Sequence, residues 1–143
     1  MPRAAGPKPT APSIATPAVS APYKVLVVDA DPDTRFLYKT ALEAVTAVIS
    51  EAEDGAEALG KAICEPPTLV LTDSRLPRLD GFALCASLRR EPATAGAGIV
   101  VISSVDSPSA TSRAYASGAD AVLIKPCTMD ELVHTVQRVC LTR

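Results

Sequence analysis

The sequence has 143 residues and a formal net charge of −2, and 48% of its residues are hydrophobic although only 3% are aromatic. A chain of this length can form one domain with a full core, which we expect to consist of Val, Ile, Leu and Ala side chains. The near-neutral charge disfavours direct nucleic-acid binding and attachment to a membrane surface. No run approaches the roughly 18 apolar residues of a membrane span.

The four cysteines, Cys64, Cys85, Cys127 and Cys140, have neither CxxC spacing nor a histidine at metal-ligand spacing. They therefore predict neither a zinc site nor a disulfide framework. We expect reduced, mostly buried thiols in a cytoplasmic protein.

Residues 1–22 contain six of the 13 prolines, together with many Ala, Ser and Thr residues. Such a segment cannot bury enough apolar surface to offset the entropy of ordering, so we predict a disordered Pro/Ala-rich tail. It also lacks the apolar stretch of a signal peptide. The folded domain is expected at residues 23–143.

Five apolar runs with strand character follow, and each is followed by a segment with helical spacing. The runs are 24–29, 47–52, 68–72, 98–103 and 121–125. Consecutive rather than alternating apolar residues are typical of strands covered on both faces, as in a parallel sheet. In the first helix we expect an apolar stripe to face the core. It consists of Phe36, Leu37, Thr40, Ala41, Ala44 and Val45.

Strands that alternate with helices imply right-handed βαβ units, and short connections favour one compact domain. We therefore predict an α/β fold, a flavodoxin-like, doubly wound parallel sheet of five strands in the order 2-1-3-4-5, with five helices.

Polar side chains stand where four of these strands end: Asp29, Asp73, Ser103 and Lys125. The carboxyl ends of parallel strands share one edge, where ligands bind. Two carboxylates need Mg²⁺ or a lysine between them, and hydroxyl and ammonium groups suit phosphoryl oxygens. A carboxylate can also accept a phosphoryl group as an acyl phosphate. Singly, each residue has a plain structural role, such as a turn hydroxyl for Ser103; together they predict a phosphoryl site.

The segments VLVVDADPDTR, LVLTDSRLPRLDGF, IVVISS and GADAVLIKPC resemble the signature segments of response-regulator receiver domains, in order and in spacing. The resemblance covers residues 24–141 and is to the single-domain, chemotaxis-regulator type. It implies that Asp73 is the phospho-acceptor and that Ser103 and Lys125 bind the phosphoryl group. It also implies a structural role for Pro126 as the family's cis-proline.

The resemblance further implies a Mg²⁺ ion held by Asp29, Asp73 and the backbone carbonyl of Arg75. The family usually places a second acidic residue directly after the first, and here that residue is Ala30, which predicts weaker Mg²⁺ binding. Asp31 is either a substitute ligand or the N-cap of the helix that begins at Pro32.

A second position, residue 122, also departs from the family's pattern. Val122 stands where the family has an aromatic switch residue, so a rotamer change of Tyr or Phe cannot be the readout. By its spacing Tyr115 does not replace it, and the resemblance implies that residue 115 lies where the family packs an aliphatic residue into the core. Arg75 and Val105 stand where the family flanks the water that hydrolyses the aspartyl phosphate. Neither can accept a proton from water, which predicts slow dephosphorylation.

By resemblance, a sensor histidine kinase or phosphotransfer protein donates the phosphoryl group, and the chain itself is not expected to turn over a substrate as an enzyme. No other domain is expected beside the receiver, so the output is docking on a downstream protein target that the sequence does not identify. A phosphorylation-independent pseudo-receiver, suggested by Ala30, is the alternative. A flavin- or nucleotide-binding protein is a third possibility, but no Gly-rich loop follows the first strand.

Overall fold

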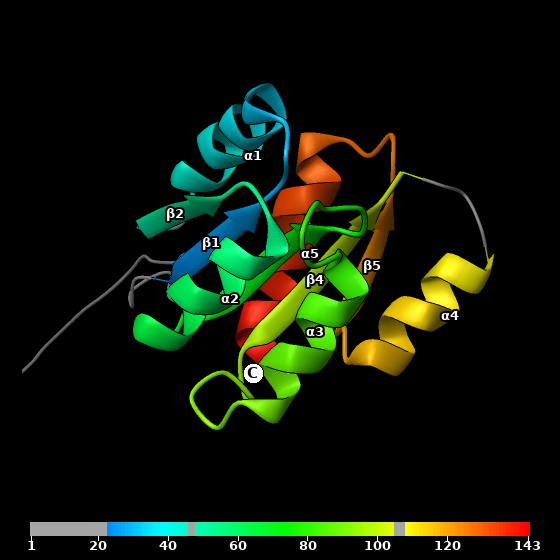
Figure 1. Ribbon diagram of the computed structural model, residues 1–143. Helices are drawn as coiled ribbons and strands as arrows, with labels where there is room; N and C mark the ends of the chain where they lie inside the picture. Colours follow the sequence, from blue (N-terminus) through cyan, green and yellow to red (C-terminus); the bar gives the residue numbers. More distant parts are fainter. Residues whose placement is uncertain (1–22, 46–47, 105–107) are drawn as a thin grey trace, which may run out of the picture.

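The computed structural model describes residues 23–45, 48–104 and 108–143. The predicted tail at 1–22 and Val105 lie outside the described residues. Strands and helices alternate along the chain (Figure 1). In order they are β1 (Lys24–Val28), α1 (Pro32–Glu43), β2 (Val48–Ala52), α2 (Gly55–Cys64), β3 (Leu69–Asp73), α3 (Gly81–Arg90), β4 (Gly98–Ser103), α4 (Pro108–Ser117), β5 (Ala121–Ile124) and α5 (Met129–Thr142).

The strands form one parallel sheet in the order β2-β1-β3-β4-β5, as the sequence predicts. The strand order reverses between β1 and β3, which are paired from Val25 with Leu69 to Val28 with Thr72. In doubly wound sheets, ligands bind at the carboxyl ends of the strands beside such a reversal. The topology therefore fixes the edge at which a site is expected.

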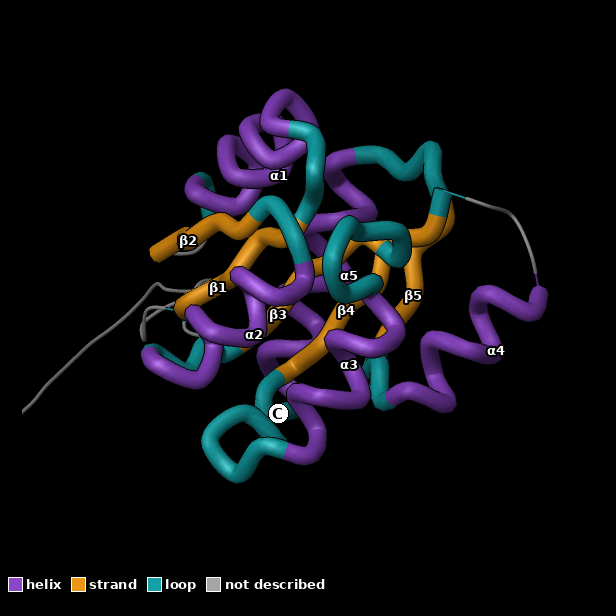
Figure 2. The backbone as a smooth tube through the Cα atoms, viewed as in Figure 1, coloured by secondary structure: helices purple, strands orange, loops and turns teal. Residues whose placement is uncertain are grey.

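Helices cover both faces of the sheet (Figure 2). On one face, α1 and α5 pack on the strands, with Leu132 and Val136 of α5 in the first core. On the other face, Ala58, Leu84 and Ala114 bring α2, α3 and α4 into a second core. The central strands contribute to both cores, which explains their consecutive apolar residues. Among the described helices, none has the length and apolar character needed to cross a membrane.

The face of α1 that packs on the core differs from the predicted one. Tyr38 and Leu42 are buried, whereas Phe36 and Leu37 are 69% and 50% exposed. The prediction that the stripe beginning at Phe36 faces the core is therefore wrong. Both sets of residues have helical spacing, so periodicity alone does not choose between them. Arg35, on the same helical face as Tyr38, hydrogen-bonds the backbone at the end of β1 and turns that face inward.

Two expectations about burial are also corrected. Tyr115 is 50% exposed, because a neighbouring alanine of α4 takes the buried position. Cys85 and Cys140 are buried as expected, but Cys64 is exposed and Cys127 is half-buried. Burial raises the pKa of Cys85 to about 12 and that of Cys140 to about 11, so both thiols are protonated at neutral pH.

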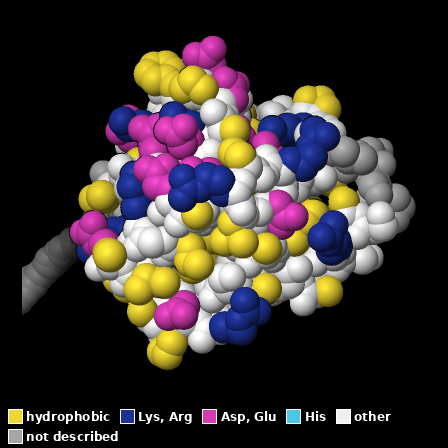
Figure 3. All heavy atoms as spheres, viewed as in Figure 1, with side chains coloured by type: hydrophobic (Ala, Val, Ile, Leu, Met, Phe, Trp, Pro, Cys, Tyr) yellow, Lys and Arg dark blue, Asp and Glu magenta, His cyan; other side chains and the backbone are white. Residues whose placement is uncertain are grey.

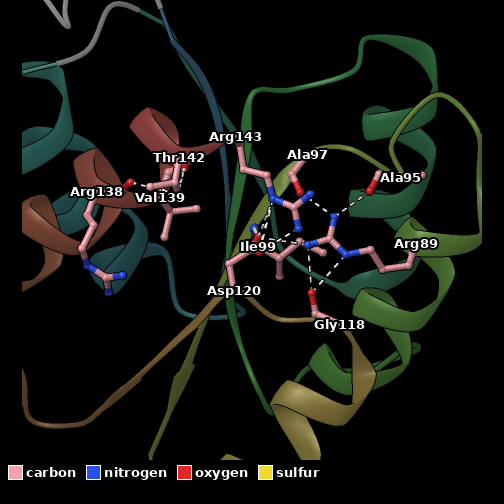
Figure 4. A network of polar contacts seen from close by, with 10 residues as sticks. All are labelled: Arg89, Ala95, Ala97, Ile99, Gly118, Asp120, Arg138, Val139, Thr142 and Arg143. Atoms are coloured by element: carbon pink, nitrogen blue, oxygen red, sulfur yellow. Dashed lines mark hydrogen bonds and ion pairs between the residues drawn. The ribbon is translucent and has the colours of Figure 1, made fainter.

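Asp120, at the amino end of the sheet just before β5, is enclosed by two arginines (Figure 4). Arg89 of α3 and Arg143 at the end of the sequence approach its carboxylate with N–O distances of 3.0 and 2.7 Å. The backbone N of Ile99 donates a hydrogen bond of 2.8 Å to the same carboxylate. Arg89 also donates to the carbonyl of Gly118. The cluster thus ties α3, β4, β5 and the end of α5 together.

Candidate functional site

Two aspartates leave the carboxyl end of the sheet side by side. Asp29 directly follows β1, and Asp73 is the last residue of the neighbouring β3. The residues before them, Val28 and Thr72, are paired across the two strands. Both side chains are largely buried, with 5% of the Asp29 side chain and 12% of the Asp73 side chain exposed. Two carboxylates this close repel each other and need a cation.

Lys125 supplies a cation from the end of β5. Its Nζ lies 3.2 Å from Oδ2 of Asp73 and 3.8 Å from Oδ2 of Asp29. The backbone N of Lys125 donates to the carbonyl of Ser103 at 2.8 Å, which fixes the end of β5 beside β4. The peptide bond to Pro126 is cis, as the resemblance implies. One ammonium group thus faces two carboxylates, and the site keeps a net negative charge.

The carboxylate of Asp29 is only half satisfied. Its Oδ1 accepts a hydrogen bond from the N of Asp31 at 2.9 Å, whereas its Oδ2 is buried with no hydrogen-bond donor among the described residues. Burial raises the pKa of Asp29, and the charge of Asp73 adds to that rise, against the hydrogen bond from Asp31 and the charge of Lys125. A buried carboxylate oxygen without a donor is costly unless a cation binds there.

These oxygens fit Mg²⁺, which prefers carboxylate and carbonyl ligands and keeps several waters. The N of Arg75 donates to Oδ1 of Asp73 at 3.2 Å, so the Arg75 backbone, whose carbonyl is the third candidate ligand, runs beside Asp73. Within the described residues, no three His, Cys, Asp or Glu side chains gather into a metal cluster. The remaining ligands would therefore be backbone and water oxygens.

Asp31 is the N-cap of α1. Its Oδ1 accepts from the N of Asp33, and its Oδ2 accepts from both the N and the Oγ1 of Thr34. The Thr34 hydroxyl bond contributes most to lowering the pKa of Asp31. Of the two roles predicted for Asp31, the structure shows that of the helix N-cap. Metal ligation would require it to give up these bonds.

Ser103 is buried at the end of β4, next to the strand that ends in Asp73. Its neighbour Ser104, which we did not predict as a site residue, accepts a hydrogen bond from Nη2 of Arg75. Arg75 therefore reaches from the loop after β3 to Ser104 after β4, across the edge that carries Asp73. A long cation and a hydroxyl on adjacent strand-end loops are the sequence signal for such a contact.

Gly81 allows α3 to begin beside Asp73. A Cβ at this position would lie 2.2 Å from the carbonyl oxygen of Asp73. The N of Gly81 donates to the carbonyl of Ser74 at 2.9 Å, and Asp80 caps α3 by accepting from the N of Ala83 at 2.9 Å. Any side chain at residue 81 would push the loop between Asp73 and α3 away from the site.

The order of these elements and the residues at their ends agree with one known family. A family model described as "Response regulator receiver domain" matches residues 25–137. The chain belongs to this family. It is a response regulator receiver domain of two-component signalling.

Individual relatives agree with the assignment. The gliding motility regulatory protein of Myxococcus xanthus is 37% identical over 116 residues, which are 78% of this chain and 15% of that protein. Protein PilG of Pseudomonas aeruginosa is 30% identical over 114 residues, 80% of this chain and 84% of PilG. The structure of the chemotaxis response regulator CheY4 of Vibrio cholerae aligns with a TM-score of 0.78 at 28% identity, over 83% of this chain and 99% of CheY4. The receiver thus spans a small part of some curated relatives and most of others.

Receiver domains generally bind Mg²⁺, and in two-component systems they interact with histidine kinases and downstream effectors. In this receiver, the structure brings the carboxylates of Asp29 and Asp73 within 3.8 and 3.2 Å of the Lys125 ammonium group and places Ser103 at the end of β4. The second acidic residue of the family is missing from this site. The exposed Ala30 occupies its position, and its side chain has no atom that can bind a metal.

Proposed function

We propose that this receiver accepts a phosphoryl group on Asp73 from the phosphohistidine of a sensor histidine kinase or a phosphotransfer protein. The observation that carries the proposal is the unequal pairing of the two carboxylates with Lys125. Its ammonium group lies 3.2 Å from Asp73, while the buried Oδ2 of Asp29 has no hydrogen-bond donor among the described residues. The acceptor is thus oriented and the neighbouring oxygen is ready for a cation. We also propose that the protein acts in the cytoplasm.

In the transfer, a carboxylate oxygen of Asp73 forms a bond to phosphorus while the P–N bond of the phosphohistidine breaks. The imidazole leaves with the electron pair of that bond, and Asp73 becomes an acyl phosphate. Lys125 and Ser103 contribute an ammonium and a hydroxyl group for the phosphoryl oxygens. Asp73 accepts one phosphoryl group, and we propose no further turnover.

Asp29, Asp73 and the carbonyl of Arg75 would hold Mg²⁺. The bound ion would neutralise negative charge that develops on the phosphoryl oxygens. The role of the chain's own residues is to present these oxygens together, which the paired strand ends β1 and β3 achieve. With Ala30 in place of an acid, the ion loses one charged contact, and we propose weaker binding as a consequence.

The output is docking on a downstream protein. Val122 is half-buried and has no ring that could change its rotamer, so the readout is proposed to use the backbone after β4 and β5 instead. A phosphorylation-independent interaction module is not favoured. Such a module has no need for a lysine placed between two buried carboxylates, which is an expensive arrangement in a protein interior.

The test is direct phosphorylation. The protein is incubated with Mg²⁺ and acetyl phosphate or phosphoramidate, and intact-mass spectrometry is used to look for the gain of one phosphate. The gain is expected in the wild type, and Asp73→Asn should abolish it because the nucleophilic charge is lost while the shape is kept. The matched control Asp33→Asn changes an exposed acid in the first turn of α1 and should label like the wild type. Full labelling of Asp73→Asn would show that the acceptor is another residue, and a folded wild type that never labels would favour the interaction module.

A further inference from the structure

The backbone carbonyl of Asp29 is held by a side chain that the proposed chemistry does not use. Nη1 of Arg35, in the second turn of α1, donates to this carbonyl at 2.6 Å. Nε of the same guanidinium donates to Oε1 of Glu51 on β2 at 3.0 Å. Only 15% of the Arg35 side chain is exposed. A planar guanidinium that makes two bonds in fixed directions is well suited to orient the groups it contacts.

Glu51 is itself fixed from several sides. Lys39 approaches its Oε2 at 3.5 Å, while Arg35 takes Oε1. The backbone carbonyl of Glu51 accepts from Nζ of Lys61 at 2.5 Å. Acidic and basic side chains gather here, over α1, β2 and α2, on the face seen in Figure 3. They line a shallow polar hollow formed by Arg35, Glu51, Ala52, Glu53, Glu57 and Lys61.

The Arg35 bond acts on the turn that orients the carboxylate of Asp29. Inside this turn, Oδ1 of Asp29 accepts a hydrogen bond of 2.9 Å from the backbone N of Asp31. On its other side, Arg35 holds the carbonyl of the same residue, and the N of Asp29 donates to Ala52 at 3.1 Å. The backbone and one carboxylate oxygen of Asp29 are therefore fixed, so that Oδ2 is left facing Lys125.

We infer that Arg35, anchored by Glu51, is a positioning residue for Asp29, which sets the direction of Oδ2 for the cation. The inference rests on the proposed Mg²⁺ role of Asp29. The orientation of Asp29 matters more here than in a site with two adjacent acids. With Ala30 in place of the second acid, the proposed carboxylate ligands are Asp29 and Asp73. A shift of one of two charged ligands weakens a site that has no spare ligand.

The test compares Arg35→Met with Lys39→Met. Both substitutions remove a cation that pairs with Glu51, both lie on α1, and Met keeps helix propensity. Of these two cations, only Arg35 is hydrogen-bonded to Asp29. Mg²⁺ affinity is measured by amide NMR titration, hydrogen exchange of the Asp31 amide is measured in metal-free protein, and urea unfolding reports stability.

Arg35→Met is expected to weaken Mg²⁺ binding about tenfold and to speed exchange of the Asp31 amide, in keeping with the loss of affinity when an outer-shell partner is removed. Lys39→Met should change both readouts less than about twofold, the ordinary result for a half-exposed ion pair. Arg35→Lys keeps the positive charge but not the planar guanidinium that bonds both Asp29 and Glu51, so it should restore part of the affinity. It replaces Arg35→Met in the test if Arg35→Met does not fold.

Equal effects of Arg35→Met and Lys39→Met on affinity and exchange would overturn the inference, as would a loss of stability alone. If the wild type binds no Mg²⁺, the metal step of the proposed function fails by itself. The exchange of the Asp31 amide then still decides whether Arg35 holds the turn, because that measurement needs no metal.

Discussion

Asp29 and Asp120 lie at opposite ends of the same sheet and differ in how fully their carboxylates are satisfied. Burial alone would raise the pKa of Asp120, but hydrogen bonds from Arg143 and Ile99 and the charges of Arg143 and Arg89 prevail, and its pKa is lowered. Both carboxylate oxygens of Asp120 accept hydrogen bonds (Figure 4). At this end of the sheet, the carboxylate of Asp120 joins α3, β4 and the end of α5.

Asp29 has the opposite balance. Burial raises its pKa, and the nearby charge of Asp73 reinforces the rise, although the N of Asp31 and the charge of Lys125 oppose it. Its Oδ2 is left without a donor in the described part of the chain. A native protein keeps an unsatisfied buried group chiefly where a function requires it. Unlike the Asp120 end, the carboxyl end of the sheet therefore gives up stability and keeps a buried carboxylate oxygen, without a hydrogen-bond donor among the described residues, available for a cation.

The largest change in folding stability is expected when the charge of Asp120 is removed. Asp120→Asn removes the charge that two arginines share, and we expect the free energy of unfolding to fall by about 2–3 kcal/mol, the range for hydrogen bonds to charged groups. Urea unfolding measures the change. The lowered pKa means that this stabilisation is present above the unfolded pKa of 3.8 and is lost as the pH falls through the lower folded value. The difference from the wild type should therefore shrink in acid below pH 3.8.

Glu43→Gln is the control, since Glu43 is an exposed acid at the end of α1. Its free energy of unfolding should stay within about 0.5 kcal/mol of the wild type. An Asp120→Asn protein as stable as this control would show that the arginine cluster is only an exposed charge network.

At the other end of the sheet, the same change should have the opposite sign. Asp29→Asn removes a buried charge whose Oδ2 has no hydrogen-bond donor among the described residues, and we expect the metal-free protein to gain about 1 kcal/mol at neutral pH. Because the folded pKa of Asp29 is raised, its penalty is full above the folded value and disappears below the unfolded value of 3.8. The gain should therefore vanish in acid. A loss of stability at neutral pH would mean that Lys125 already compensates Asp29.

The sheet and its polar edge could be predicted because buried parallel strands have a strong signature. The runs 25–28 and 69–71 are apolar at every position, and the first charged residue after each run is Asp29 or Asp73, so both aspartates could be placed at strand ends from the sequence. The cis bond at Pro126 was implied by the resemblance and is present.

Contacts that depend on tertiary geometry could not be predicted in the same way. On α1, the exposed Phe36 and the buried Tyr38 both belong to helical stripes, and only the packing on the sheet distinguishes them. The bond from Arg35 to the carbonyl of Asp29 joins a side chain to a backbone group, which no residue pattern specifies. Arg89 and Asp120 are 31 positions apart and meet only because α3 and β5 are neighbours at one end of the fold.

Completing the acidic pair is expected to change metal binding rather than folding stability. Ala30→Asp adds a charged ligand beside the free oxygen of Asp29 and should tighten Mg²⁺ binding by about tenfold or more, as expected for a contact worth about 1–3 kcal/mol. An NMR or calorimetric Mg²⁺ titration measures it. Asp31→Ala is the companion variant. Because Asp31 caps α1, it should cost about 1 kcal/mol of stability and leave Mg²⁺ affinity unchanged. A sharp loss of Mg²⁺ affinity in Asp31→Ala would instead make Asp31 the substitute ligand.

The smallest expected effect concerns how long the aspartyl phosphate lasts. Hydrolysis needs a water molecule aligned opposite the leaving carboxylate, and Arg75 lies along that edge, with its guanidinium held by Ser104. Arginine stays cationic and cannot accept a proton from water, so we expect Arg75 to shield a phosphoryl group on Asp73 without activating the water. The loss of general-base help and positioning is worth about 10²-fold in rate. We therefore expect a lifetime of many minutes rather than seconds, suited to a slow response or to one ended by a separate phosphatase.

Arg75→Asn should shorten this lifetime several-fold, because a short amide opens the edge and can orient water. Ser104→Ala, which frees the same guanidinium without removing its charge, should have a smaller effect in the same direction. Decay of the phosphate-sized mass gain after removal of the phosphodonor measures both variants. A wild-type lifetime of seconds, or a decay rate that Arg75→Asn leaves unchanged, would show that this arginine does not protect the phosphoryl group.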